Sequence, residues 1–272
     1  MFCTVARSLL SDGCDGLNML GTTGEATSFS LAERRALMEA TAKAGLPLER
    51  MIVGTGAAAI DDATALTGHA CDLGFAGALV LPPFYYKNVS DDGVLAYIAA
   101  IVQSLRGKRF PLYLYNFPAL SGVAYSVDLV QRLLSAFPDH IAGLKDSSGD
   151  LPYARAVAAI DPRLAVFPSS EACLKEARSG AFAGCISATA NLTAALCARA
   201  LHEQDDRALA KAIALRAAFE GIPLVPAVKA MMAHMRQSPS LEKVKPPLVT
   251  LPTETRKRLI GKYQSILEAD FA

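Results

Sequence analysis

IAGLKDSSGD, residues 141–150, joins a short apolar run to a lysine and a small polar loop, and it decides the fold prediction. Ile141 to Leu144 predict a buried strand, and the residues after Lys145 predict a loop that leads into a helix. A lysine that ends a buried strand is desolvated unless a cleft opens there. Desolvation favours the neutral amine, which can attack a carbonyl carbon. The alternative is a lysine that packs its stem and keeps its ammonium in water.

Strands and helices alternate on both sides of this stretch. Short apolar runs predict seven strands, at residues 16–20, 51–56, 77–86, 111–118, 141–144, 164–167 and 184–189. Apolar residues at helical spacing predict helices at 3–12, 30–45, 61–73, 90–105, 126–136, 151–160, 170–179, 192–237 (with a break near 221–226) and 252–268. Such an alternation is typical of a parallel sheet covered by helices.

The fold class that fits best is α/β, a (β/α)8 TIM barrel with a C-terminal helical extension. Such a barrel needs eight strands. Because the chain opens on a helix, we expect the first strand to be the one that is absent. No linker rich in Pro, Ser or Gly divides the chain before about residue 195. We therefore expect the barrel over residues 1–195 and a helical region over residues 196–272.

Composition excludes several classes of function. The net charge is +1 and there is no basic cluster, which argues against nucleic acid and anionic membranes as partners. No apolar run reaches the roughly 18 residues that span a bilayer, and the N-terminus lacks the pattern of a signal peptide. The six cysteines form no CxxC pair and the four histidines have no metal-ligand spacing. We expect a cytoplasmic protein without a metal site.

Small polar residues and tyrosines follow the predicted strands, where a parallel barrel has its active site. Thr22, Thr23 and Gly24 predict a tight turn whose N–H groups suit a carboxylate, although a glycine turn is also common for its geometry alone. Tyr115 follows a strand, where its phenol can exchange protons or simply pack in the core. Together with Lys145, these residues suggest that a lysine attacks the ketone of a 2-oxo acid.

Three motifs carry a family resemblance. GTTGE (21–25), YNFP (115–118) and GLKDSSGD (143–150) are similar in order and spacing to the site motifs of the dihydrodipicolinate synthase and N-acetylneuraminate lyase family. ISATAN (186–191) resembles the last barrel strand of that family. The resemblance runs from near residue 3 to the C-terminus. It implies a TIM barrel, usually a tetramer built as a dimer of dimers, with class I aldolase chemistry and no cofactor.

The resemblance also implies roles for single residues. Lys145 resembles the lysine that forms the Schiff base, and Tyr115 the tyrosine that passes protons. Thr23 and Gly24 fall where the family binds the pyruvate carboxylate, and a backbone carbonyl lines the pocket at Ile186. Thr22 and Tyr85 fall where the synthases build a hydroxyl relay, with the tyrosine from a neighbouring subunit.

Departures from the synthase pattern concern specificity. Leu120 stands where synthases carry an arginine for the carboxylate of the second substrate, and YNFPALSG resembles the sialic acid lyases instead. Aspartate semialdehyde is therefore expected to be a poor substrate, unless a group such as Lys87 replaces the arginine. Those lyases bind sugar hydroxyls through acidic residues, to which Ser169, Ser170 and Glu171 are a poorer match.

The lysine feedback site of the synthases relies on polar and histidine positions that follow GTTGE. Leu31 and Arg34 stand in that region here, so we expect no such regulation. The expected function is a Schiff-base-forming aldolase or lyase that acts on pyruvate, or a related 2-oxo acid, and an aldehyde. The alternatives are a true dihydrodipicolinate synthase and a catalytically idle protein that binds a small oxo acid.

Overall fold

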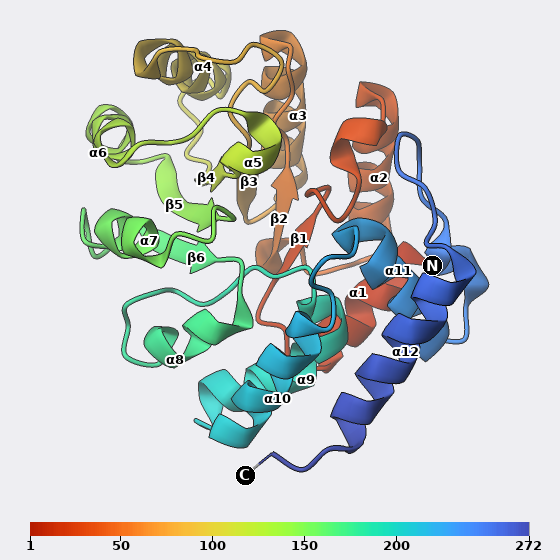
Figure 1. Cartoon of the computed structure of the whole chain (residues 1–272). Coiled ribbons are helices and arrows are strands. Elements are labelled where there is room, and N and C mark those ends of the chain that lie inside the picture. Colours follow the sequence, from red (N-terminus) through yellow and green to blue (C-terminus); the bar gives the residue numbers. More distant parts are fainter. Residues whose placement is uncertain (272) are drawn as a thin grey trace.

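A curled parallel sheet forms the centre of the protein (Figure 1). The computed structural model describes residues 1–271, and within them the sheet has six strands in the order β1-β2-β3-β4-β5-β6. Their bounds are β1 Leu17–Met19, β2 Met51–Gly54, β3 Gly77–Val80, β4 Leu112–Asn116, β5 Ile141–Asp146 and β6 Ala165–Pro168. Every neighbouring pair is parallel, so the carboxyl ends of the strands lie at one edge of the sheet.

Helices cover the outer side of the sheet and form a separate group at the C-terminal end of the chain (Figure 1). The first group consists of α1 Phe2–Ser11, α2 Leu31–Lys43, α3 Ile60–Leu73, α4 Asp91–Ser104, α5 Pro118–Ser121, α6 Val127–Ala136, α7 Leu151–Ala158 and α8 Leu174–Ala177. The second consists of α9 Ala190–His202, α10 Asp206–Ala217, α11 Leu224–Met235 and α12 Thr253–Glu268. A capping box begins α2: the Ser30 side chain accepts from the N–H of Glu33, and the Glu33 carboxylate accepts from the N–H of Ser30.

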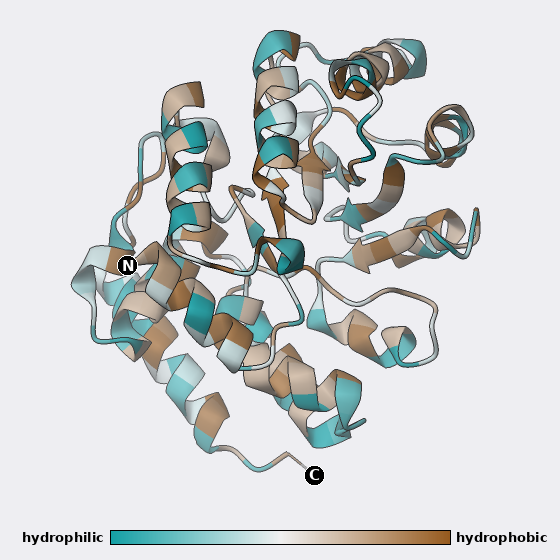
Figure 2. Ribbon diagram, turned by 180° about the vertical axis from the view of Figure 1, so that it is seen from behind, coloured by the Kyte–Doolittle hydropathy of each residue, from teal (hydrophilic) through white to brown (hydrophobic). Residues whose placement is uncertain are grey.

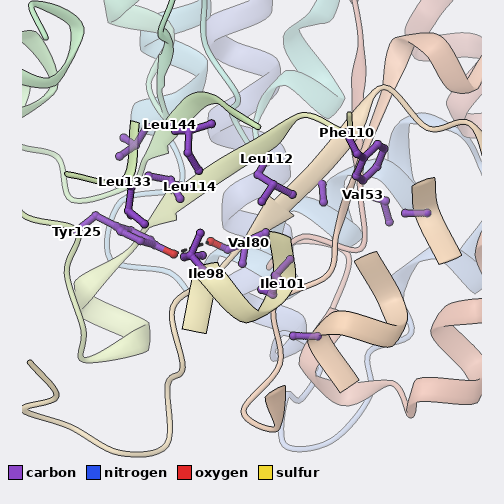
Figure 3. Packing of buried hydrophobic residues seen from close by; sticks show 14 of the residues in the cluster. Val53, Val80, Ile98, Ile101, Phe110, Leu112, Leu114, Tyr125, Leu133 and Leu144 are labelled. Atoms are coloured by element: carbon purple, nitrogen blue, oxygen red, sulfur yellow. Dashed lines mark hydrogen bonds between the residues drawn. The ribbon is translucent and has the colours of Figure 1, made fainter. Parts of the chain in front are cut away.

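The core lies between the sheet and its covering helices. Figure 3 shows part of it, with Val80, Leu112, Leu114 and Leu144 from the strands packed against helix residues such as Ile98. In Figure 2 the strands are mostly hydrophobic, whereas the helices carry hydrophilic residues as well. Strands that are buried on both faces are expected when helices cover a parallel sheet. A second hydrophobic cluster joins α10, α11 and α12.

The predicted strand over residues 184–189 is wrong. Residues 183–186 run beside β6 and donate two backbone hydrogen bonds to it, from Ala183 to Val166 at 3.0 Å and from Ile186 to Pro168 at 3.2 Å. The two donors are three residues apart, whereas their acceptors in β6 are two residues apart. This extra residue breaks the regular hydrogen-bond ladder of a parallel pair. The Gly184 carbonyl lies 3.6 Å from the thiol of Cys173 instead.

Other differences are local. β5 continues through Lys145 to Asp146, so the lysine is part of the strand, and the strands predicted at 77–86 and 111–118 are shorter. The helix predicted at 170–179 is a 3-10 turn, Glu171–Cys173, followed by α8. The region 192–237 has a further break between α9 and α10. All six cysteines are free thiols.

No strand precedes β1 in residues 1–271. An eight-stranded barrel without its first strand would have seven strands, and six are observed in the described residues. The expected barrel therefore stays a prediction. The division into residues 1–195 and 196–272 also stays a prediction, and its boundary lies within α9.

Candidate active site

Lys145 and Tyr115 lie side by side because β4 and β5 pair them in register. Paired residues of neighbouring strands point to the same face of a sheet. The Lys145 ammonium lies 4.3 Å from the centroid of the Tyr115 ring. Lys145 is 8% exposed and Tyr115 is 2% exposed, so both side chains are largely removed from water. The structure thus brings the two main predicted catalytic residues together.

The next pair in the register, Asn116 and Asp146, fastens the ends of the two strands on the opposite face. The Asn116 amide donates to the Asp146 carboxylate at 2.8 Å, and the Ser148 hydroxyl donates to its other oxygen at 2.9 Å. Asp146 is 2% exposed, and these hydrogen bonds satisfy its buried carboxylate. Sequence reasoning missed this pair, although each residue directly follows a predicted catalytic residue.

Thr22 extends the pair to a group of three. Its hydroxyl lies 3.1 Å from the phenol oxygen of Tyr115, and either oxygen can be the donor. The lysine, the phenol and this hydroxyl come from three different strand ends, as the prediction required. A hydroxyl next to a phenol at hydrogen-bond distance provides a route for a proton.

The turn at residues 21–25 closes on itself through two backbone hydrogen bonds, from Glu25 to the Thr22 carbonyl at 3.0 Å and from Ala26 to the Gly21 carbonyl at 3.2 Å. Within residues 1–271, the N–H groups of Thr23 and Gly24 donate to no protein acceptor. Unpaired N–H groups in a tight turn suit an anion.

A cavity of about 270 Å³ opens beside Thr22 and Tyr115. Leu120, which is 61% exposed, and the buried Ser121 are among the residues that line it. The lining is largely apolar, and its single charged side chain is that of Arg34: Leu20, Gly21, Thr22, Ala26, Thr27, Arg34, Gly54, Gly56, Leu79, Leu81, Phe84, Tyr115, Phe117, Leu120 and Ser121. Lys145 lies beside the Tyr115 ring and is not part of this lining. Sequence reasoning missed the apolar walls at Leu79, Leu81 and Phe117, because nothing local distinguishes them from core residues.

Arg34 is a buried cation on α2. Its guanidinium donates to the carbonyls of Gly54 at 2.7 Å and Gly56 at 3.3 Å, while its Nε has no partner in the described residues. Burial lowers the pKa of Arg34 to about 10. Arg34 and Leu31 also line a second cavity of about 200 Å³. The expected absence of lysine feedback at this region stays a prediction.

Lys87 joins two segments at the mouth of the first cavity. Its ammonium donates to the carbonyl of Ser121 at 2.8 Å and also to that of Phe84. Two of its three donors are therefore used within the protein, which ties residue 84 to residue 121 across the mouth.

The remaining predicted site residues form no hydrogen bond with this group. Tyr85 is 76% exposed and its ring stacks edge to face on Tyr86, with centroids 5.3 Å apart. Ser169 directly follows β6, and Ile186 is held beside the same strand end by its hydrogen bond to Pro168. Within residues 1–271 neither residue forms a hydrogen bond with Lys145, Tyr115 or Thr22.

Glu171 has a different role from a sugar ligand. Its side chain is fully buried, and its carboxylate accepts from Ser187 at 2.9 Å and from Thr189 at 2.5 Å. Arg216 of α10 pairs with it at 3.4 Å. These contacts join the end of β6 to the C-terminal helices and leave the carboxylate committed to the protein. Two further findings concern the described residues: no three His, Cys, Asp or Glu side chains are grouped to hold a metal ion, and no helix has the length and apolarity to cross a membrane.

The fold and the site together define a class of parallel α/β proteins in which a lysine, a tyrosine and a threonine meet at the carboxyl ends of the strands. The dihydrodipicolinate synthetase family matches residues 2–265. The chain belongs to this family of lyases and aldolases.

Individual relatives agree with this assignment. An uncharacterised DapA-like lyase of Chloroflexus aurantiacus is 34% identical over 267 residues, which are 96% of this chain and 88% of that protein. The crystal structure of dihydrodipicolinate synthase from Agrobacterium tumefaciens has a TM-score of 0.92 at 30% identity and covers 98% of this chain and 92% of the other. A variant of 2-keto-3-deoxygluconate aldolase from Sulfolobus solfataricus, 21% identical, shares the fold with a TM-score of 0.84 over 97% of this chain and 89% of its own.

Proposed function

We propose that this protein is a Schiff-base-forming aldolase that joins, or releases, pyruvate or a related 2-oxo acid and an aldehyde. The observation that carries the proposal is that Tyr115 contacts both Lys145 and Thr22, which brings together residues from the carboxyl ends of β1, β4 and β5. A largely buried amine next to a phenol is suited to attack a carbonyl and to move the protons that the attack requires.

The chemistry follows from these groups. The Lys145 amine adds to the ketone carbon, the carbonyl oxygen leaves as water, and an imine forms. In condensation the iminium lets the neighbouring carbon lose a proton to give an enamine, which attacks the aldehyde carbon while the aldehyde oxygen takes up a proton. Cleavage runs these steps in reverse. In either direction water then adds to the imine and releases the product and the Lys145 amine. Tyr115 moves protons to and from the oxygen that leaves or forms, and Thr22 is its hydrogen-bond partner. In this scheme the imine supplies the electron sink, so no separate cofactor is proposed.

The carboxylate of the 2-oxo acid is proposed to bind at the turn of Thr23 and Gly24, where two N–H groups lack a protein acceptor. Ile186 and Ser169 would border the same strand ends. The exposed ring of Tyr85 supports a further proposal, that the active form is a homo-oligomer in which Tyr85 reaches a neighbouring site. The fold proposed for that form is a TIM barrel, in a cytoplasmic protein.

The aldehyde partner is proposed to be neutral or hydroxylated rather than acidic. Leu120 offers no donor at the mouth of the cavity, and the Lys87 ammonium nearby already serves two carbonyls. A second carboxylate there lacks a charged hydrogen bond worth about 1.5–3 kcal/mol. Aspartate semialdehyde, the substrate of a true dihydrodipicolinate synthase, is therefore ranked below neutral aldehydes.

The decisive experiment is reduction with borohydride in the presence of pyruvate. One pyruvate-derived mass is expected on the peptide that contains Lys145. Lys145→Arg is expected to abolish the label, because a guanidinium stays protonated and does not form the imine. Lys87→Arg serves as the control, since it changes a lysine outside the reacting group. Labelling at another lysine, or none on folded protein, overturns the proposal and favours a non-catalytic oxo-acid binder.

A further inference from the structure

We propose that Glu25 is a positioning residue, which the C-terminal region holds so that the turn at Thr23 and Gly24 is ready to bind a carboxylate. This inference rests on the proposed function of that turn. Glu25 is the last residue of GTTGE and is 6% exposed. Its carboxylate pairs with the Lys229 ammonium of α11 and accepts from the N–H of Lys245 at 2.6 Å. Both partners lie more than 200 residues further along the chain.

The backbone of the turn explains why an anchor is needed. Leu20 and Glu25, the residues on either side of it, both have left-handed conformations, with φ of 52° and 55°. Residues with a Cβ adopt this region at a cost, and they keep it only where surrounding contacts hold them. At Glu25 those contacts are the ion pair and the hydrogen bond from the C-terminal region.

Charge gives the anchor a second effect. Glu25 follows Gly24 directly, so a free carboxylate at Glu25 would repel the carboxylate of a bound oxo acid. The Lys229 ammonium and the Lys245 N–H offset this charge. The Glu25 carboxylate is already engaged by Lys229 and Lys245, so it acts through the turn rather than by touching the substrate.

Lys245 also contacts the residues that follow the turn. Its ammonium pairs with Glu33 at 2.7 Å and lies 4.1 Å from the centroid of the Phe29 ring. Residues 25, 29 and 33 are thus all held by the segment that contains Lys245. The turn and the start of α2 are placed as one unit.

The test compares two variants that each remove one cation of the C-terminal region. Lys229→Met removes the ion-pair partner of Glu25 and leaves only the hydrogen bond from the Lys245 N–H. Arg256→Met breaks the pair of Arg256 with Glu242, which is 2.8 Å long and does not contact the turn. In Lys229→Met, the pyruvate concentration that gives half-maximal borohydride trapping at Lys145 is expected to rise at least tenfold. In Arg256→Met it is expected to stay within twofold of wild type, even if both variants lower the melting temperature equally.

A second measurement judges the anchor without pyruvate. Hydrogen exchange of residues 20–26 is expected to accelerate at least tenfold in Lys229→Met and to be unchanged in Arg256→Met. If wild-type protein is not trapped by pyruvate, the proposed function fails while the exchange result still decides whether Lys229 holds the turn. Equal exchange, or equal half-saturation, in the two variants overturns the inference.

If Lys229→Met does not fold, a smaller change tests the same positioning role. Glu25→Asp keeps the charge and withdraws the carboxylate by one methylene. It is expected to raise the half-saturating pyruvate concentration three- to tenfold with the maximum extent of trapping unchanged. A value equal to wild type, in a variant with normal folding, contradicts the positioning role.

Discussion

The Thr22 hydroxyl and the Tyr115 phenol lie 3.1 Å apart, and neither oxygen is fixed as the donor. The geometry therefore allows a hydrogen bond in which either hydroxyl donates. Aldol cleavage and aldol condensation need proton transfers of opposite sense at the same atoms. A pair that serves both directions fits the chemistry proposed for the site.

Removing this phenol is expected to separate imine formation from turnover. Tyr115→Phe keeps the ring packed next to Lys145 and loses the hydroxyl, so turnover should fall by roughly 100-fold or more. The measurement is kcat with pyruvate and an aldehyde. Tyr113→Phe is the matched control, because Tyr113 lies in the same strand and its ring packs on Phe167. A Tyr115→Phe enzyme with the activity of the control would assign Tyr115 to packing.

Among helices and strands, features encoded by residues close together in the sequence could be predicted, whereas features that depend on distant residues could not. The bounds of α2 follow from the capping box at Ser30, which is encoded within four residues. The end of β5 and the failure of residues 184–189 to form a strand depend on register with a neighbour. The ion-pair partners of Glu25 and Glu171, Lys229 and Arg216, lie on helices far along the chain, so no local pattern marks them.

β2 contains the position where backbone approach is closest. A Cβ on Gly54 would lie 1.8 Å from the Leu20 carbonyl oxygen, so the strand passes against the turn without room for a side chain. Gly54→Ala is expected to lower the free energy of unfolding by about 1–3 kcal/mol, as overpacking does. Urea unfolding measures this.

Gly68 provides the control for that prediction. It lies within α3, and nothing lies within 4 Å of a Cβ added there. Gly68→Ala is expected to raise the free energy of unfolding by about 0.5–1 kcal/mol, since alanine loses less backbone freedom in a helix. Equal effects of the two substitutions would contradict the close approach at Gly54.

At the scale of the whole molecule, buried tyrosines contribute to the response to alkali. Burial raises the pKa of Tyr97 to about 12, and it also raises the pKa of four others: Tyr113, Tyr125, Tyr153 and Tyr263. Above pH 10 the unfolded chain loses these protons while the folded chain keeps them. The stability that the raised pKa values contribute is therefore present below pH 10 and is lost as the pH rises further.

The free energy of unfolding is accordingly expected to be lower at pH 11 than at pH 8, by about 1 kcal/mol for Tyr97 alone. Urea unfolding at the two pH values measures the difference, and absorbance at alkaline pH reports how many tyrosines ionise in the folded state. In Tyr97→Phe the difference should shrink by that amount. A protein as stable at pH 11 as at pH 8 would show that these phenols are open to solvent.

The link between Glu25 and Lys229 has a consequence for the order in which the protein is made. The two residues are 204 positions apart, and Lys245 follows Glu25 by 220. At 5–20 residues per second, Lys229 is synthesised roughly 10–40 s after Glu25. All six strands have left the ribosome before then, so a nascent chain can pair its sheet while the turn at Thr23 and Gly24 is still unanchored. The site is thus expected to become competent only when α11 and the segment that contains Lys245 have docked.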